Sequence, residues 1–117
     1  MHIFNRSDRV SNLIHREISN IIEYEMKDTH IGMVTVTGVE MSRDLKNAKV
    51  FFSVLGDQSA VESNVEALNN AANFFRSRLR ERVILKRIPN LLFAYDSSTV
   101  HGLHIDKLFD EINKQKS

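Results

Sequence analysis

The chain has 117 residues with a hydrophobic share of 42%, so it is long enough to bury the core of one domain without covalent support. It contains no cysteine, which excludes disulfides, thiolate nucleophiles and cysteine-ligated zinc or iron–sulfur sites. No window approaches the roughly 18 consecutive apolar residues of a membrane span, and the start of the chain lacks the apolar core of a signal peptide. We therefore expect a cytoplasmic protein without membrane association, with one domain over residues 1–113 and a short tail at 114–117.

Residues 7–26 carry the most regular helical pattern in the chain. Their apolar residues recur at steps of three and four, as on one face of an amphipathic helix, and charged residues occupy the rest of the wheel. Ser7 is a suitable N-cap for this helix, with Asn5 and Asp8 as alternatives.

Two β-rich segments follow a polar break at residues 27–32. Val34 and Val36 share one face of the first strand, and after Gly38 the apolar phase moves by one residue, as a β-bulge produces. Residues 47–55 alternate in the same manner, and the polar residues between the two segments form a turn. The pair therefore predicts an antiparallel hairpin.

A long helical pattern then runs from about residue 59 to about residue 85. Ser59 and Glu62 match a capping box at its start, and Pro89 is expected to stop it. Because this helix is long for a domain of this size, we expect a break inside it. Residues 91–96 indicate a third strand, and residues 103–112 a short closing helix.

The predicted order is helix, strand, strand, broken helix, strand and helix. It describes a two-layer α+β domain in which helices cover one face of a three-stranded sheet. The long helical crossover between the second and third strands is the connection that parallel pairing requires.

Positive charge is concentrated near the end of the long helix. Residues 76–87 hold six basic residues and one acidic residue, a net charge of +5 in a chain whose total is +1. On a helical wheel Arg76, Arg80 and Arg87 fall on one flank of the apolar stripe, and the other arginines fall on the opposite flank. Two readings stay open: a polyanion binds these charges, or the arginines pair with acids on the same helix and its neighbours.

Many short pieces along nearly the whole chain resemble the ribosome-binding factor A family of bacteria. They include Val36-Thr37, Val39-Glu40-Met41-Ser42, Ala48-Lys49-Val50 and Arg87-Ile88-Pro89-Asn90-Leu91. The resemblance implies a type II KH-like domain that binds the small ribosomal subunit and its rRNA. It also implies a role in late small-subunit maturation and in small-subunit rRNA processing, especially in the cold.

The resemblance also locates the break in the long helix. KH domains carry a Gly-x-x-Gly loop that clamps a nucleic-acid backbone between two helices, and residues 59–85 contain no such sequence. The family has an Ala-x-Gly kink instead, which corresponds here to Ala71, Ala72 and Asn73. Asparagine stands where the family usually has glycine, and it tolerates left-handed backbone geometry better than most residues do.

We therefore predict an RNA-binding surface centred on the basic helix. Its primary residues are Arg76, Arg80 and Arg87, and the wider set comprises Arg78, Lys86, Arg43, Lys46, Arg6 and Arg9. Phe74 either stacks on a base or packs into the core if the kink turns it inward.

An alternative function is a non-catalytic adaptor whose basic helix meets an acidic protein surface. The five histidines form no zinc-binding pattern, and the chain has neither a phosphate-binding glycine loop nor a nucleophile elbow. We therefore expect no enzyme activity, no metal and no other cofactor. The sequence has no exposed heptad seam, which favours a monomer.

Overall fold

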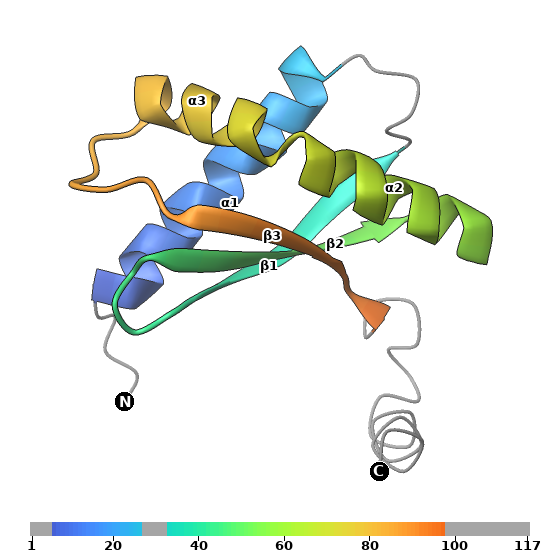
Figure 1. The fold of residues 1–117 in the computed structure, drawn as a ribbon, viewed down its shortest axis with the longest axis horizontal. Helices are drawn as coiled ribbons and strands as arrows, with labels where there is room; N and C mark the ends of the chain where they lie inside the picture. Colours follow the sequence, from blue (N-terminus) through green and yellow to red (C-terminus); the bar gives the residue numbers. More distant parts are fainter. Residues whose placement is uncertain (1–5, 27–32, 98–117) are drawn as a thin grey trace, which may run out of the picture.

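The computed structural model describes residues 6–26 and 33–97 (Figure 1). The elements are α1 (Arg6–Glu25), β1 (Val34–Met41), β2 (Asn47–Val54), α2 (Gln58–Asn70), α3 (Ala72–Arg82) and β3 (Asn90–Tyr95). The closing helix expected at residues 103–112 and the expected tail lie outside the described residues. Within the described ranges, no helix is both long enough and apolar enough to cross a membrane.

The three strands form one sheet in the order β1-β2-β3. β1 and β2 make the predicted antiparallel hairpin, and β3 pairs with β2 in parallel. Val36 lies opposite Phe52 and Gly38 lies opposite Phe51, so Thr37 is the extra residue of the predicted bulge. The bulge restores the apolar phase, because Val36 before it and Val39 after it both pack into the core.

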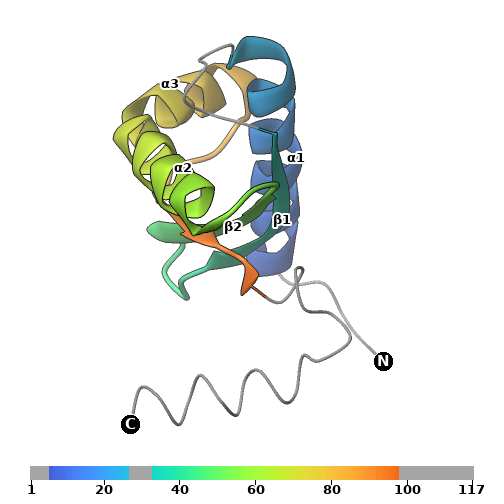
Figure 2. The same cartoon turned by 90° about the vertical axis from the view of Figure 1, so that its right-hand side faces the viewer.

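The core lies between one face of this sheet and the three helices, which lie on the same side of it (Figure 2). Alternate residues of β2 point into the core, so Ala48, Val50 and Phe52 are buried whereas Lys49, between Ala48 and Val50, is exposed. From the helices, the largest fully buried side chains are Ile14, Ile18, Ile21, Leu68, Phe75 and Leu79. The predicted α+β arrangement is therefore confirmed.

The starts of two helices differ from the sequence expectation. Asp57, not Ser59, is the N-cap of α2, because its Oδ1 accepts a hydrogen bond from the amide of Ala60 at 3.0 Å. A carboxylate adds favourable charge at the positive end of the helix, so Asp57 is the stronger cap of the two. α1 already begins at Arg6, which places Ser7 inside the helix and leaves its N-cap outside the described residues.

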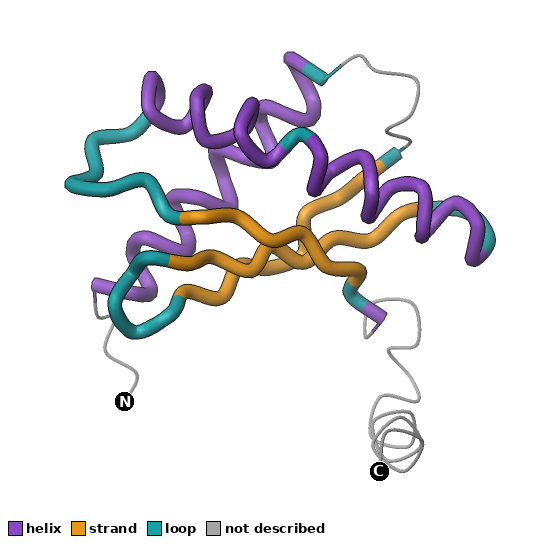
Figure 3. Tube along the Cα trace, viewed as in Figure 1, coloured by secondary structure: helices purple, strands orange, loops and turns teal. Residues whose placement is uncertain are grey.

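The predicted break in the long helix lies at Ala71, between α2 and α3 (Figure 3). Ala71 has φ −92° and ψ 7°, outside the helical region, while its amide still donates to the carbonyls of Ala67 and Leu68 at 3.1 Å. Asn73 lies inside α3, and neither α2 nor α3 contains a residue with positive φ. The kink therefore forms without the left-handed geometry that glycine or asparagine supplies.

α3 ends at Arg82, earlier than the sequence pattern indicates. Val83 is extended, with φ −126° and ψ 152°, and its side chain is buried. Residues 83–89 form the connection from α3 to β3, which we call the basic loop. Lys86 and Arg87 lie in this loop, so the helical wheel that grouped Arg87 with Arg76 and Arg80 is wrong.

Candidate nucleic-acid interface

Arg76, first among the predicted RNA contacts, is half-buried and bonded to the basic loop. Its Nε donates to the carbonyl of Pro89 and its Nη2 donates to the carbonyl of Ile88, each at 3.1 Å. These two carbonyls immediately precede β3, so the guanidinium ties α3 to the end of the loop. The structure gives Arg76 an internal role, and its contact with RNA stays a prediction.

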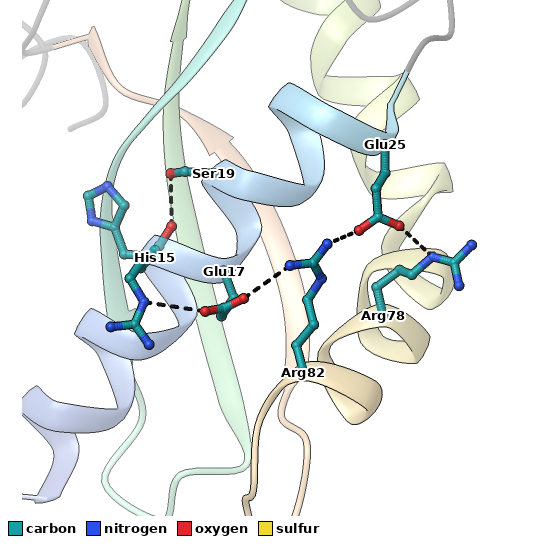
Figure 4. A network of polar contacts seen from close by, with 7 residues as sticks. His15, Glu17, Ser19, Glu25, Arg78 and Arg82 are labelled. Atoms are coloured by element: carbon teal, nitrogen blue, oxygen red, sulfur yellow. Dashed lines mark hydrogen bonds and ion pairs between the residues drawn. The ribbon is translucent and has the colours of Figure 1, made fainter.

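Arg78 and Arg82 face α1 and pair with its acids (Figure 4). Arg78 Nε lies 2.8 Å from Glu25 Oε1, and Arg82 Nη1 lies 3.3 Å from Glu17 Oε1. Arg82 also pairs with Glu25, and this hydrogen bond raises the pKa of the Arg82 guanidinium. For these two arginines, the pairing expected from neighbouring acids is what the structure shows. Partly exposed ion pairs contribute little to stability, so the main consequence of these contacts is that the two arginines are already paired.

Two roles were predicted for Phe74, stacking on a base or packing into the core, and the structure shows that it packs inward. Its ring lies edge-on to Phe75, with centroids 5.9 Å apart, and Arg78 lies over its face at 5.0 Å. Arg80, by contrast, is exposed and pairs with no other residue in the described part of the chain. α3 therefore presents much less free charge than its sequence suggests.

Four basic residues from three distant segments converge instead on a cleft of about 380 Å³, which we call the basic cleft. Arg6 comes from the first turn of α1, Lys46 from the turn between β1 and β2, and Lys86 and Arg87 from the basic loop. Each is exposed and makes no ion pair with any described residue. The apolar residues of the lining are Val10, Leu45 and Leu85.

Asp44 is the one acid that lines the basic cleft, and it is used by the hairpin turn. Its Oδ1 accepts from the hydroxyl of Ser42 at 2.7 Å and from the amide of Lys46 at 3.0 Å. These hydrogen bonds, the first from Ser42, lower the pKa of Asp44 and keep it ionised. With four cations and one acid, the cleft carries a net charge of +3.

Backbone contacts hold the segments of the cleft in register. The Lys46 carbonyl accepts from the amide of Asn90 at 2.9 Å, which joins the hairpin turn to the first residue after the basic loop. Leu45, with φ 61°, adopts left-handed geometry that is costly for leucine, and its side chain packs against the core in return. The turn that presents Lys46 is therefore fixed from both sides.

The structure brings together part of the predicted set. Lys46, Lys86 and Arg87 meet in the basic cleft, joined by Arg6, which the sequence placed only in the wider surface. Arg43 is exposed in the same hairpin turn, outside the cleft lining. Arg9 lines a separate shallow groove on the outer surface of α1, together with Asn12, Leu13 and Arg16.

The element order, the antiparallel and parallel strand pairs and the helices on one face define a type II KH-like α+β domain. Comparisons of the sequence with known proteins agree with this fold. The sequence model of the family described as ribosome-binding factor A matches residues 6–109. Ribosome-binding factor A of Desulfitobacterium hafniense is 44% identical over 111 residues, which cover 95% of this chain and 89% of that protein. The chain belongs to the ribosome-binding factor A family.

Known structures share the fold. The solution NMR structure of a Thermotoga maritima protein has a TM-score of 0.72 and 27% identity, covering 80% of this chain and 90% of that one. A homology model of Thermus thermophilus ribosome binding factor A, fitted into the cryo-EM map of a 30S complex of that factor, has a TM-score of 0.61 and 24% identity. It covers 72% of this chain and 88% of the fitted chain.

Proposed function

We propose that this chain binds the small ribosomal subunit through its rRNA and acts as an assembly factor. It works late in small-subunit maturation and supports processing of the small-subunit rRNA, with the greatest demand in the cold. It acts by occupying the immature subunit as a cytoplasmic monomer, without a catalytic step or a cofactor. Membership of the family supports ribosome binding, and the T. thermophilus relative was fitted into the map of a 30S complex.

The observation that carries the RNA contact is the convergence of Arg6, Lys46, Lys86 and Arg87 on the basic cleft. A concentrated positive surface attracts the phosphate backbone and releases its counterions on binding. These four side chains need break no described ion pair to meet a phosphate, whereas Arg78 and Arg82 would have to leave Glu25. The free cations of the cleft are therefore better placed to bind RNA than the paired arginines of α3.

The adaptor alternative relied on a basic helix that meets an acidic protein. Arg76 is bonded to loop carbonyls, and Arg78 and Arg82 are paired with acids, which leaves Arg80 as the exposed, unpaired arginine of α3. The helix therefore offers little free charge to a protein partner, and we do not favour this function.

Co-sedimentation with purified small subunits over a salt series tests the proposal. The triple variant Lys46→Gln/Lys86→Gln/Arg87→Gln should bind more weakly, and its salt slope should be smaller by about 2 to 3, because each phosphate contact contributes about 0.7–0.9. Lys49→Gln removes an exposed charge from the open face of the sheet and should bind as the wild type does. Treatment with nuclease should release the wild-type protein. Equal affinity and equal slope for the triple variant would refute the role of the cleft.

A further inference from the structure

Ile84 has the highest exposure of the large hydrophobic residues in the described part of the chain, at 102%. Its neighbours face the other way, since Val83 is buried and Leu85 is half-buried against the core. Burial that alternates in this manner is typical of an extended segment, in which residues two apart project to the same side. Ile84 itself is not part of the cleft lining, but it precedes Lys86, one of the cations of the basic cleft, by two residues.

The backbone on both sides of Ile84 is fixed. Before it, the amide of Val83 donates to the carbonyl of Leu79 at 2.9 Å, and the Val83 side chain enters the core. After it, Arg76 donates to the carbonyls of Ile88 and Pro89 at 3.1 Å. A side chain carried on a fixed loop loses little conformational entropy when a ligand covers it.

Single exposed hydrophobic residues are ordinary on protein surfaces, and this chain has others. Leu55 is 78% exposed after β2, and Leu92 is 55% exposed on β3. Neither lies within two residues of a cation of the basic cleft, whereas Ile84 does. Ile84 differs because full exposure, a fixed backbone and adjoining cations occur together at one position.

We propose that Ile84 packs against the face of an unpaired base in an RNA whose phosphates bind Lys86 and Arg87. This inference rests on the proposed function, in which the basic cleft holds RNA. An aliphatic side chain has no charge for a phosphate and no polar group for a base edge, so the surface that it can cover is the apolar face of a base. In a duplex these faces are stacked on one another, whereas bases in loops and single strands are available.

The test compares the affinity of the full chain for a single-stranded RNA and for a duplex of the same length, by fluorescence anisotropy. Ile84→Ser should weaken binding to the single strand about fivefold, as expected from the partial burial of an isoleucine, and should leave the salt slope unchanged. Its binding to the duplex should stay at the wild-type value. The matched variants Leu55→Ser and Leu92→Ser should bind both RNAs as the wild type does. Thermal unfolding confirms that each variant is folded.

Three results would overturn the proposed contact between Ile84 and an unpaired base, and each can be distinguished from the others. Unchanged affinity of Ile84→Ser for single strands, while Lys86→Gln/Arg87→Gln binds more weakly, would refute the base contact and leave the proposed function intact. An equal loss on duplex and single strand would exclude selection of unpaired bases. If Ile84→Ser weakened binding to intact small subunits but left binding to both RNAs unchanged, Ile84 would contact a protein. If the wild type binds neither RNA nor subunits, the proposed function itself fails.

Discussion

Replacing Arg76 by lysine separates the internal role of this residue from a direct contact with RNA. Lysine keeps the positive charge but cannot reproduce the planar fork that donates to the carbonyls of both Ile88 and Pro89. A hydrogen bond from a charged donor contributes about 1.5–3 kcal/mol when it is buried. Because Arg76 is half-buried and lysine can retain one bond, we expect the free energy of unfolding to fall by about 1–2 kcal/mol.

Urea denaturation followed by circular dichroism measures this change, and the thermal midpoint should fall by about 4–8 °C. Small-subunit binding should weaken modestly, since the basic loop is held less firmly, while its salt slope stays at the wild-type value. Arg80→Lys is the matched control on the same helix and should leave stability unchanged, because Arg80 is exposed and unpaired within the described residues.

Unchanged stability together with a smaller salt slope would refute an internal role for Arg76. If Arg76 meets a phosphate directly, Arg76→Lys should leave the unfolding free energy unchanged. Arg76→Gln should then lower the salt slope by about 0.7–0.9 through loss of one contact. An internal role predicts a loss of stability in both variants and an unchanged slope in both.

Three further changes test the elements that surround the site. Asn69→Ala removes the side chain that donates to the Phe93 carbonyl and accepts from its amide, both at 2.9 Å, so urea denaturation should show a loss of about 2–3 kcal/mol. Asp57→Ala should cost about 1 kcal/mol by the same assay, whereas Ser59→Ala should cost much less. Because the pKa of Asp44 is lowered by folding, its carboxylate stabilises the protein above the unfolded pKa of about 4, and this contribution is lost as the pH falls through the folded pKa. Asp44→Asn should remove that dependence from a pH series of unfolding curves.

The parts of the fold that the sequence predicts well depend on local patterns. The phase shift at Gly38 is visible in the sequence because the residues on either side must face the same core, and the register confirms the bulge. The break near Ala71 was expected because an unbroken helix would outgrow the domain. Neither prediction required knowledge of how distant segments pack.

The end of α3 was harder to predict. Leu79 and Val83 are four residues apart and both enter the core, so periodicity alone extends the helix through Val83. In the structure, Val83 reaches the core from an extended backbone instead, which its β-branched side chain favours. This difference of a few residues moved Lys86 and Arg87 from a helix into the basic loop.

The composition of the site depends on tertiary contacts that a sequence does not display. Arg78 and Arg82 count as free charges until α1 places Glu25 beside them. Arg6 and Lys46 are forty residues apart and join Arg87 only because the start of α1 packs beside the hairpin turn. The sequence identified a basic surface, and the packing of α1, the turn and the loop determines where its free charge lies.

In the proposed function, the basic cleft, rather than the exposed side of α3, is the surface that meets rRNA. Site-specific photo-cross-linking to purified small subunits tests it most directly, with the photoreactive amino acid placed in turn at positions 86, 80 and 62. Position 62 lies on the exposed side of α2, away from the cleft lining, and serves as the control. We predict that rRNA is recovered from position 86 and not from position 62, with little from position 80. Strong rRNA cross-links from position 80, with none from position 86, would contradict a role for the basic cleft in rRNA binding.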